Sequence, residues 1–357
     1  MEQFKKLASW LGVEHAIILA PMAGGISTPA LVAAVSNAGG LGSLGAGYLT
    51  PRQIAESVAE VRSLTSRPFA VNLFAGGPDG TGSGDATRML ELMAPHHAGL
   101  GLQPPTIPDD VLPSFEDQVA VIFDANIPIF SFTFGIPPAA TMAQMKARGV
   151  KLIGTATTVA EARALETAGV DAIVAQGSEA GAHRGTFLAS CEDSLIGTLA
   201  LVPQIADAVA LPVIASGGIM DGRGIVAAAA LGASGVQMGT AFLVCPESGA
   251  PPAYKAAVRQ ARDDSTILTR AFSGRLARGI SNSFATEMKA HERSILPYPA
   301  QNSMTRPMRT AAAQKGDADH LSLWAGQAAM LAREMRAGDL VQQLVREGAE
   351  LADSIGG

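Results

Sequence analysis

The chain has 357 residues, of which 26 are basic and 32 acidic, for a net charge of −6. Hydrophobic residues make up 48% and charged residues 16%, which predicts a large buried core and excludes intrinsic disorder as the main state. No cluster of lysine and arginine stands out, so a nucleic-acid-binding protein is not expected. The length exceeds the roughly 250 residues of a single (β/α)₈ barrel by about a hundred.

The few cysteines and the N-terminal sequence predict a cytoplasmic protein. Cys191 and Cys245 are too few for a disulfide framework and are expected to be reduced thiols. The N-terminus lacks the apolar run of a cleaved signal. Residues 16–51 carry no charge, but prolines and seven glycines interrupt them, so no membrane span is expected.

Eight short apolar runs alternate with longer Ala-rich helical patterns, which is typical of parallel strands with crossover helices. Thr158 and Glu161 predict a capping box that opens a helix ending before Gly169. Together the runs predict an α/β fold, a (β/α)₈ TIM barrel. They cover residues 16–22, 40–44, 69–74, 127–134, 150–156, 172–176, 213–216 and 235–238.

Two stretches interrupt this alternation. Residues 76–126 hold a helical pattern near 86–97 between Gly- and Pro-rich connections, and they predict an insertion after strand three. Residues 243–310 predict a smaller substrate or cap domain after strand eight, and a helical pattern resumes over 322–346. The expected division is a barrel domain of residues 1–242 and 311–357 and a smaller domain of residues 243–310.

Glycines follow the last two predicted strands. Gly217 and Gly218 come after strand seven, and Gly239 and Thr240 after strand eight, where this fold commonly binds phosphate through backbone N–H groups. The alternative for either site alone is a turn between strand and helix. Two adjacent sites favour a phosphorylated ligand.

Three amide side chains stand at the ends of apolar strands: Asn72, Gln176 and Gln237. Amides there need partners that converge from other strands, and they suit a heteroaromatic ring with donors and acceptors. Structural hydrogen-bond networks use the same residues. Combined with a phosphate site, they point to flavin mononucleotide (FMN).

His183 lies in a loop of small residues, 178–185, after strand six. An imidazole projecting there could serve as base, acid or cationic anion-binder, and the sequence leaves these roles open. The other five histidines and both cysteines lack a comparable setting, so no metal site is expected.

The chain resembles the class I nitronate monooxygenases, formerly called 2-nitropropane dioxygenases, over nearly its whole length. This resemblance implies bound FMN and oxidation of alkyl nitronates, such as propionate 3-nitronate, by O₂ to a carbonyl compound and nitrite. The motifs that carry it are Ala20-Pro-Met-Ala-Gly-Gly-Ile-Ser-Thr-Pro-Ala-Leu, Phe132-Thr-Phe-Gly, Gln176-Gly-Ser-Glu-Ala-Gly-Ala-His-Arg-Gly, Ala215-Ser-Gly-Gly-Ile-Met-Asp-Gly-Arg, Gln237-Met-Gly-Thr-Ala-Phe and Trp324-Ala-Gly-Gln.

The resemblance implies that His183 is the catalytic histidine. A nitronate is already an anion, so the imidazole would hold the nitro oxygens and stabilise charge, whereas neutral nitroalkanes would require a base. Tyr298 would face the substrate, but the further tyrosines and the lysine that the family commonly supplies are not evident beside it. The expected cofactor-binding residues are Met22, Asn72, Gln176, Gly181, Gly217, Gly218, Gln237, Met238, Gly239 and Thr240.

Two other functions fit the same barrel. One is an NAD(P)H-dependent quinone or enoyl-thioester reductase, and the other is a non-catalytic protein that binds a flavin or a phosphorylated ligand. The expected partners are a small-molecule nitronate and O₂, with no nucleic acid and no membrane, and the low charge leaves a homo-oligomer open.

Overall fold

The computed structural model describes residues 1–76, 84–107 and 112–356. Its centre is a parallel eight-stranded sheet in the order β1-β9-β8-β6-β5-β4-β3-β2. Backbone hydrogen bonds of 2.9 Å from Leu19 to Leu41 and from Leu41 to Ile17 close the sheet into a barrel. The strands are β1 (Ile17–Leu19), β2 (Gly42–Gly45), β3 (Phe69–Phe74), β4 (Ile129–Thr133), β5 (Lys151–Ala156), β6 (Ala172–Gln176), β8 (Val213–Ser216) and β9 (Gly235–Met238).

The predicted (β/α)₈ barrel is confirmed, and each of the eight apolar runs overlaps one barrel strand. β1 and β4 are each at least three residues shorter than predicted. β1 ends before Pro21, which has no N–H to donate to a neighbouring strand. β4 ends before Phe134, whose φ of 73° lies outside the extended region.

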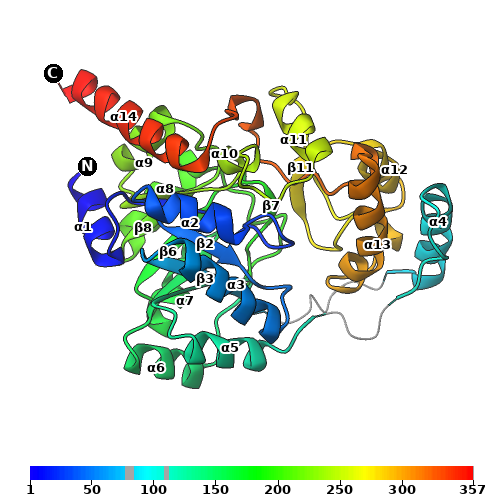
Figure 1. Cartoon of the computed structure of the whole chain (residues 1–357), viewed down its shortest axis with the longest axis horizontal. Coiled ribbons are helices and arrows are strands. Elements are labelled where there is room, and N and C mark those ends of the chain that lie inside the picture. Colours follow the sequence, from blue (N-terminus) through cyan, green and yellow to red (C-terminus); the bar gives the residue numbers. More distant parts are fainter. Residues whose placement is uncertain (77–83, 108–111, 357) are drawn as a thin grey trace.

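Helices surround the barrel, and α14 lies beside α2 and α9 (Figure 1). α1 (Glu2–Leu11) packs against β9. The surrounding helices are α2 (Pro29–Asn37), α3 (Pro51–Leu64), α5 (Phe115–Asp124), α6 (Ala139–Ala147), α7 (Val159–Ala168), α8 (Thr198–Ala208), α9 (Gly222–Ala230) and α14 (Ala337–Gly356).

The predicted helical pattern over 322–346 is wrong in its first half. Residues 322–336 form only the short 3₁₀ turn η3 (Ala329–Leu331), and α14 begins at Ala337. Tertiary hydrogen bonds keep this segment from forming a helix: Gly326 N donates to Thr240 Oγ1 at 3.0 Å, and Gln327 N donates to the Glu179 carbonyl at 2.9 Å. These bonds outweigh the local helix propensity.

The predicted capping box at α7 is half present. The Thr158 side chain accepts from Glu161 N at 3.2 Å, and Gly169, with φ of 88°, ends the helix as expected. The Glu161 carboxylate, however, does not accept a hydrogen bond from the backbone N–H of Thr158. It is fully buried and accepts from Thr157 N at 2.7 Å and from the Thr186 hydroxyl at 2.6 Å, so it fastens the loop after β6 to the barrel.

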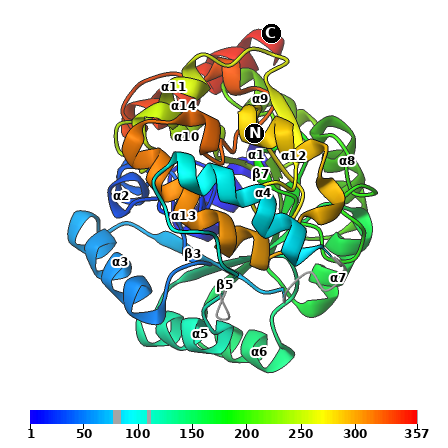
Figure 2. The same ribbon diagram turned by 90° about the vertical axis from the view of Figure 1, so that its right-hand side faces the viewer.

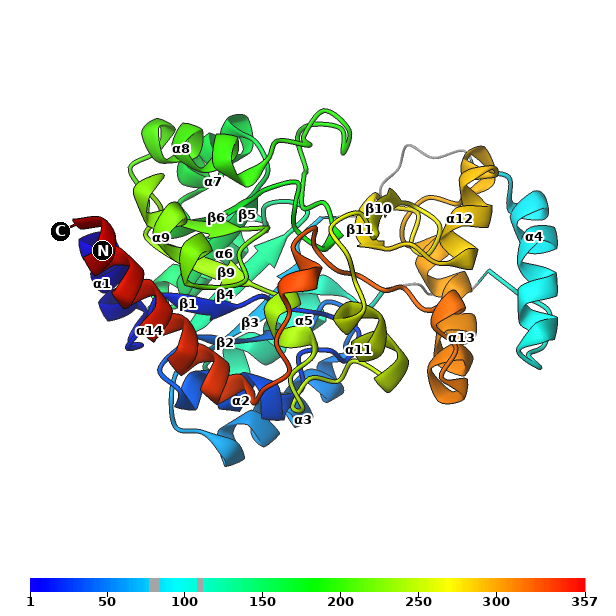
Figure 3. The ribbon, with the colours of Figure 1, turned by 90° about the horizontal axis from the view of Figure 1, so that it is seen from above.

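A second hydrophobic core lies at the carboxyl ends of the strands, and we call the elements around it the cap. Figure 1 shows the cap to the right of the barrel, Figure 2 shows α4 and α13 in front of the barrel, and Figure 3 shows α4 as the outermost helix. The cap consists of α4 (Ala86–Gly99), α11 (Pro252–Arg259), β10 (Thr266–Thr269), β11 (Ala277–Ile280), α12 (Ser283–Lys289), η1 (Glu292–Ser294), α13 (Ala300–Lys315) and η2 (Ala318–His320).

The cap core draws on more of the chain than residues 243–310. Met89 and Met93 of α4 belong to it, and so do Leu323 and Ala329, which lie beyond the predicted boundary. The division into two domains stays a prediction, and these contacts favour placing α4 and residues 311–329 with the cap. Residues 77–83 and 108–111 of the predicted insertion lie outside the described residues.

No helix in the described ranges combines the length and the apolar character needed to cross a membrane.

Candidate active site

A cavity of about 560 Å³ lies between the carboxyl ends of the barrel strands and the cap. This volume falls within the range of about 300–1,000 Å³ that is usual for small-molecule sites. His183 and all ten expected cofactor-binding residues line the cavity, whereas Tyr298 does not. The strand-end positions therefore converge in space, from Met22 after β1 to Thr240 after β9.

One wall of the cavity offers unpaired backbone donors. The N–H groups of Gly218, Ile219 and Thr240 make no hydrogen bond to another described residue. Gly217 and Gly218 have φ of 111° and 73°, a conformation that L side chains rarely adopt. The Thr240 hydroxyl accepts from Gly326 N and keeps its own hydrogen for a ligand. Neutral donors of this kind suit a phosphate group.

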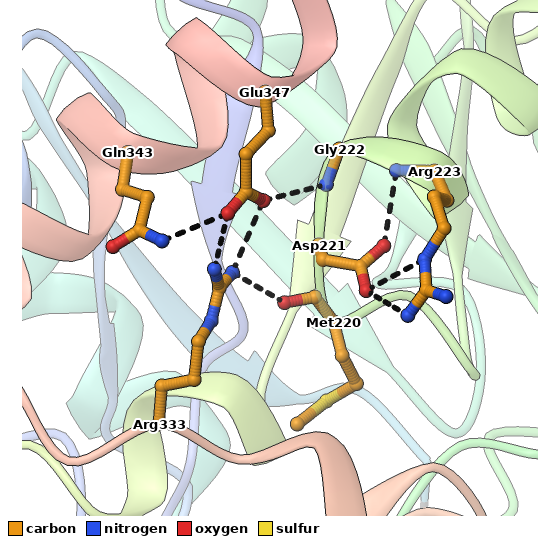
Figure 4. A network of polar contacts seen from close by, with 7 residues as sticks. All are labelled: Met220, Asp221, Gly222, Arg223, Arg333, Gln343 and Glu347. Atoms are coloured by element: carbon orange, nitrogen blue, oxygen red, sulfur yellow. Dashed lines mark hydrogen bonds and ion pairs between the residues drawn. The ribbon is translucent and has the colours of Figure 1, made fainter. Parts of the chain in front are cut away.

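A charged network holds the far end of this glycine loop (Figure 4). The Glu347 carboxylate on α14 accepts from Gly222 N at 3.1 Å and from Gln343 Nε2 at 2.8 Å. Arg333 forms an ion pair with Glu347 and donates to the Met220 carbonyl at 3.2 Å. Although partial burial alone would raise the pKa of Glu347, the hydrogen bonds from Arg333, Gly222 and Gln343 lower it, so the carboxylate is charged at neutral pH.

The three strand-end amides differ in their partners. Asn72 Nδ2 donates to Ser131 Oγ at 2.9 Å inside the barrel. Both polar atoms of the Gln176 side chain bond to the loop after β6. Nε2 donates to the His183 carbonyl at 3.1 Å, and Oε1 accepts from Gly185 N at 2.8 Å. Gln237 makes no side-chain hydrogen bond to a described residue, so its amide is available to a ligand.

The loop that carries His183 is fixed at several points. Its strand β7 (Ala182–His183) pairs with β11 of the cap, with Ala277 opposite His183. Ala182 has φ of 64°, a strained conformation for a residue with a side chain, and such strain persists only where the surroundings impose it. The buried Arg184 donates to the carbonyls of Gln176 and Thr157. The histidine is therefore held in place before any ligand arrives.

The His183 ring lies in an apolar setting. Its centroid is 5.5 Å from that of Trp324 and 6.0 Å from those of Phe134 and Tyr298. Burial, together with the positive charges of Arg275 and Arg309, lowers the pKa of His183 from 6.5 to about 3. The imidazole is therefore neutral at physiological pH. Of the roles that the sequence left open, a cationic anion-binder does not match this resting state.

Tyr298 lies beside the cavity, not in its lining. The residue is 2% exposed and packs against His183 and Phe134. Tyr48, which follows β2, lines the cavity nearby and supplies the second tyrosine that was not evident from the sequence around Tyr298. Burial raises the pKa of Tyr48, partly opposed by the Tyr298 hydroxyl and the positive charge of Arg309, so Tyr48 is a neutral donor at pH 7.

Sequence reasoning also missed the polar residues of α13 that line the cavity: Asn302, Arg306, Arg309 and Thr310. Arg309 donates to Asn302 Oδ1 at 2.9 Å, while Arg309 Nε and Asn302 Nδ2 are buried and make no hydrogen bond to a described residue. Burial lowers the pKa of Arg309 to about 10, which leaves the guanidinium charged at neutral pH. This wall can bind an anion.

Among the described residues, no group of three or more His, Cys, Asp or Glu side chains is arranged to hold a metal ion. The cavity therefore combines four kinds of group: backbone donors that suit phosphate, the free amide of Gln237, the neutral His183 and the buried cation of Arg309.

Comparison with known proteins identifies relatives along the whole chain. The family model described as nitronate monooxygenase matches residues 6–347. A protein of Staphylococcus aureus (strain Newman), named a probable nitronate monooxygenase, is 45% identical over 343 residues, which are 96% of each chain. A crystal structure of nitroalkane oxidase from Streptomyces ansochromogenes is 42% identical with a TM-score of 0.91, and covers 98% of this chain and 99% of that one. The structure of FabK from Thermotoga maritima is 31% identical with a TM-score of 0.78, and covers 99% and 98%. A match of this extent, on a barrel with this cavity, shows that the chain belongs to the nitronate monooxygenase family.

Proposed function

We propose that the protein is an FMN-dependent nitronate monooxygenase that oxidises alkyl nitronates, such as propionate 3-nitronate, with O₂ to a carbonyl compound and nitrite. The observation that carries the proposal is the two-sided cavity. Unpaired N–H groups of Gly218, Ile219 and Thr240 lie on one wall, and Arg309 and Asn302 lie on the other, with His183 also in the lining.

The residues present fit FMN. The donors of Gly218, Ile219 and Thr240 would hold the phosphate, and the Gln237 amide would meet the edge of the ring system. When bound, FMN supplies the redox chemistry that takes electrons from the substrate and passes them to O₂. The protein contributes binding, orientation and electrostatics.

Arg309 and Asn302 would hold the anionic substrate. A nitronate carries its negative charge on two oxygens, and charge-assisted hydrogen bonds from a buried guanidinium are stronger than bonds between neutral groups. Asn302 and Arg309 both line the cavity, so a nitronate bound there would lie beside the charge of the buried guanidinium. The Tyr48 hydroxyl would add a third donor.

The direct test is oxygen consumption and nitrite release by the purified flavoprotein with propionate 3-nitronate. We expect both at comparable rates. The second candidate is an NAD(P)H-dependent quinone or enoyl-thioester reductase. We keep it because FabK, which is not named as a nitronate monooxygenase, has a similar structure. Repeating the assay with NADH and a quinone tests this candidate. Rapid anaerobic bleaching of the flavin by NADH, without nitrite from the nitronate, would favour the reductase. Failure of both reactions would favour a protein that only binds the flavin.

The charge of Arg309 should matter most for anionic substrates. We expect Arg309→Met to raise KM for propionate 3-nitronate by about tenfold to a hundredfold, because a hydrogen bond to a charged group contributes about 1.5–3 kcal/mol. The KM for neutral nitroethane should change little, and FMN content should remain that of the wild type. Arg262→Met, on the exposed surface of the cap, is the control. Equal effects on both substrates would remove Arg309 from anion binding.

The network on α14 should support FMN binding from outside the cavity. We expect Glu347→Ala to weaken FMN binding about tenfold, because it frees Gly222 N and unpairs Arg333 at the end of the glycine loop. Titration of apoprotein with FMN, followed by fluorescence, measures this affinity. Glu350→Ala removes the same charge one turn further along α14, where the side chain makes no hydrogen bond or ion pair with a described residue, and should bind FMN normally.

A further inference from the structure

The His183 ring is hydrogen-bonded to a buried serine of the cap. His183 Nε2 lies 2.8 Å from Ser273 Oγ, and Ser273 is 1% exposed. Ser273 Oγ in turn donates to the Arg275 carbonyl at 3.0 Å and accepts from Arg275 N at 3.3 Å. The other ring nitrogen, Nδ1, makes no hydrogen bond to a described residue, and the ring lines the cavity.

These contacts fix the direction of the hydrogen bond between the serine and the histidine. A hydroxyl has one hydrogen, and that of Ser273 is given to the carbonyl of Arg275. Toward His183 the oxygen can then only accept, so the imidazole must carry its hydrogen on Nε2. The opposite assignment would break the 3.0 Å hydrogen bond that the Ser273 hydroxyl donates to the Arg275 carbonyl.

We propose that Ser273 is a positioning residue that holds His183 as the Nε2–H tautomer and so presents a bare Nδ1 lone pair as the proton acceptor for neutral nitroalkanes. In this step Nδ1 takes the proton from the carbon next to the nitro group. The C–H bonding pair stays on the substrate, and the products are a nitronate and an imidazolium. The Ser273 oxygen keeps its bond to Nε2–H throughout, and Arg309 and Asn302 receive the new anion.

The same arrangement separates two classes of substrate. A neutral nitroalkane needs the Nδ1 lone pair, whereas a nitronate has already lost the proton and offers Nδ1 no hydrogen. The proposal rests on the proposed function for its substrates. The assignment of the tautomer does not depend on the proposed function, because the tautomer can be measured without turnover.

The first measurement is ¹⁵N NMR of the histidine-labelled holoenzyme, with the His183 signals assigned by their loss in His183→Asn. We expect a pyrrole-type Nε2 and a pyridine-type Nδ1 in the wild type, a mixture of tautomers in Ser273→Ala, and the wild-type pattern again in Ser273→Thr, which keeps the hydroxyl. A wild-type Nδ1–H would overturn the proposal even if the enzyme oxidises nitronates well.

The second measurement compares nitroethane with its nitronate. We expect Ser273→Ala to lower kcat/KM for nitroethane about tenfold, the effect of losing one orienting hydrogen bond, and to change the value for ethyl nitronate by less than about threefold. Ser36→Ala, which removes an equally buried serine at the far end of the barrel, should leave the ratio of the two unchanged. An unchanged ratio in Ser273→Ala, with the tautomer confirmed, would show that the serine orients the ring without affecting proton transfer.

Discussion

His183→Asn is expected to purify as yellow, FMN-loaded protein that oxidises nitroethane about 10²–10⁴-fold more slowly than the wild type, the usual effect of removing a general base. The asparagine amide can still accept a hydrogen bond, but it cannot take the proton from carbon. The His183 ring makes no hydrogen bond that holds the glycine loop after β8, so flavin content should not fall. Stopped-flow reduction of the flavin under anaerobic conditions measures the step directly.

The nitronate serves as the internal control for this variant. Because a nitronate needs no base, its oxidation by His183→Asn should fall by less than about tenfold, through lost packing beside Trp324 and Tyr298. Equal loss with both substrates would assign His183 an electrostatic role. Unchanged turnover of nitroethane would remove the histidine from the mechanism.

The pH dependence of the wild type follows from the same ring. A base acts only when unprotonated, and the pKa of His183 is lowered to about 3 by burial and by Arg275 and Arg309. The kcat/KM for nitroethane should therefore stay level as the pH falls through 6.5, where an ordinary histidine would begin to lose activity, and should decline only near pH 4 and below. Ser273 hydrogen-bonds to the ring and Tyr298 packs against it.

Gly218→Asp is expected to abolish FMN binding, so that the protein purifies colourless. The substitution places a carboxylate where we locate the phosphate, and an added Cβ would also lie 3.4 Å from Glu179 Cβ, beside a second acidic residue. Like charges in a partly buried site repel strongly. Absorbance of the purified protein at flavin wavelengths measures the loss.

Gly218→Ala separates charge from backbone strain. The φ of 73° costs alanine about 1 kcal/mol, but the methyl group meets nothing closer than 3.4 Å. We expect this variant to bind FMN with affinity reduced about tenfold or less. A Gly218→Asp protein with full flavin content would show that the phosphate lies elsewhere.

The barrel and its strand-end residues could be predicted from the sequence, because the signals are local. The end of each apolar run can be located in the sequence, and the carboxyl ends of the parallel strands meet at one face of the barrel. Asn72, Gln237 and Gly218 therefore line a common cavity. Tyr48 follows the same rule, three residues after β2, and could have been found by extending the rule to every strand.

The cap residues could not be found in this way. Asn302 and Arg309 reach the cavity only because α13 packs across the barrel mouth, and no period or motif in 243–310 encodes that placement. Ser273 meets His183 from ninety residues away, and Glu161 resembles a helix cap in the sequence but supports a distant loop. Contacts of this kind depend on tertiary packing, which local patterns do not record.

The bond between Glu347 and Gly222 spans 125 residues of chain and sets an order of assembly. During synthesis the glycine loop, the barrel strands and the cap all leave the ribosome before the helix that braces the loop. A nascent chain that has reached residue 336 but not α14 contains every residue of the cavity lining and lacks that brace. Tight flavin uptake is therefore expected to be one of the last events of maturation, after α14 has docked beside α2 and α9.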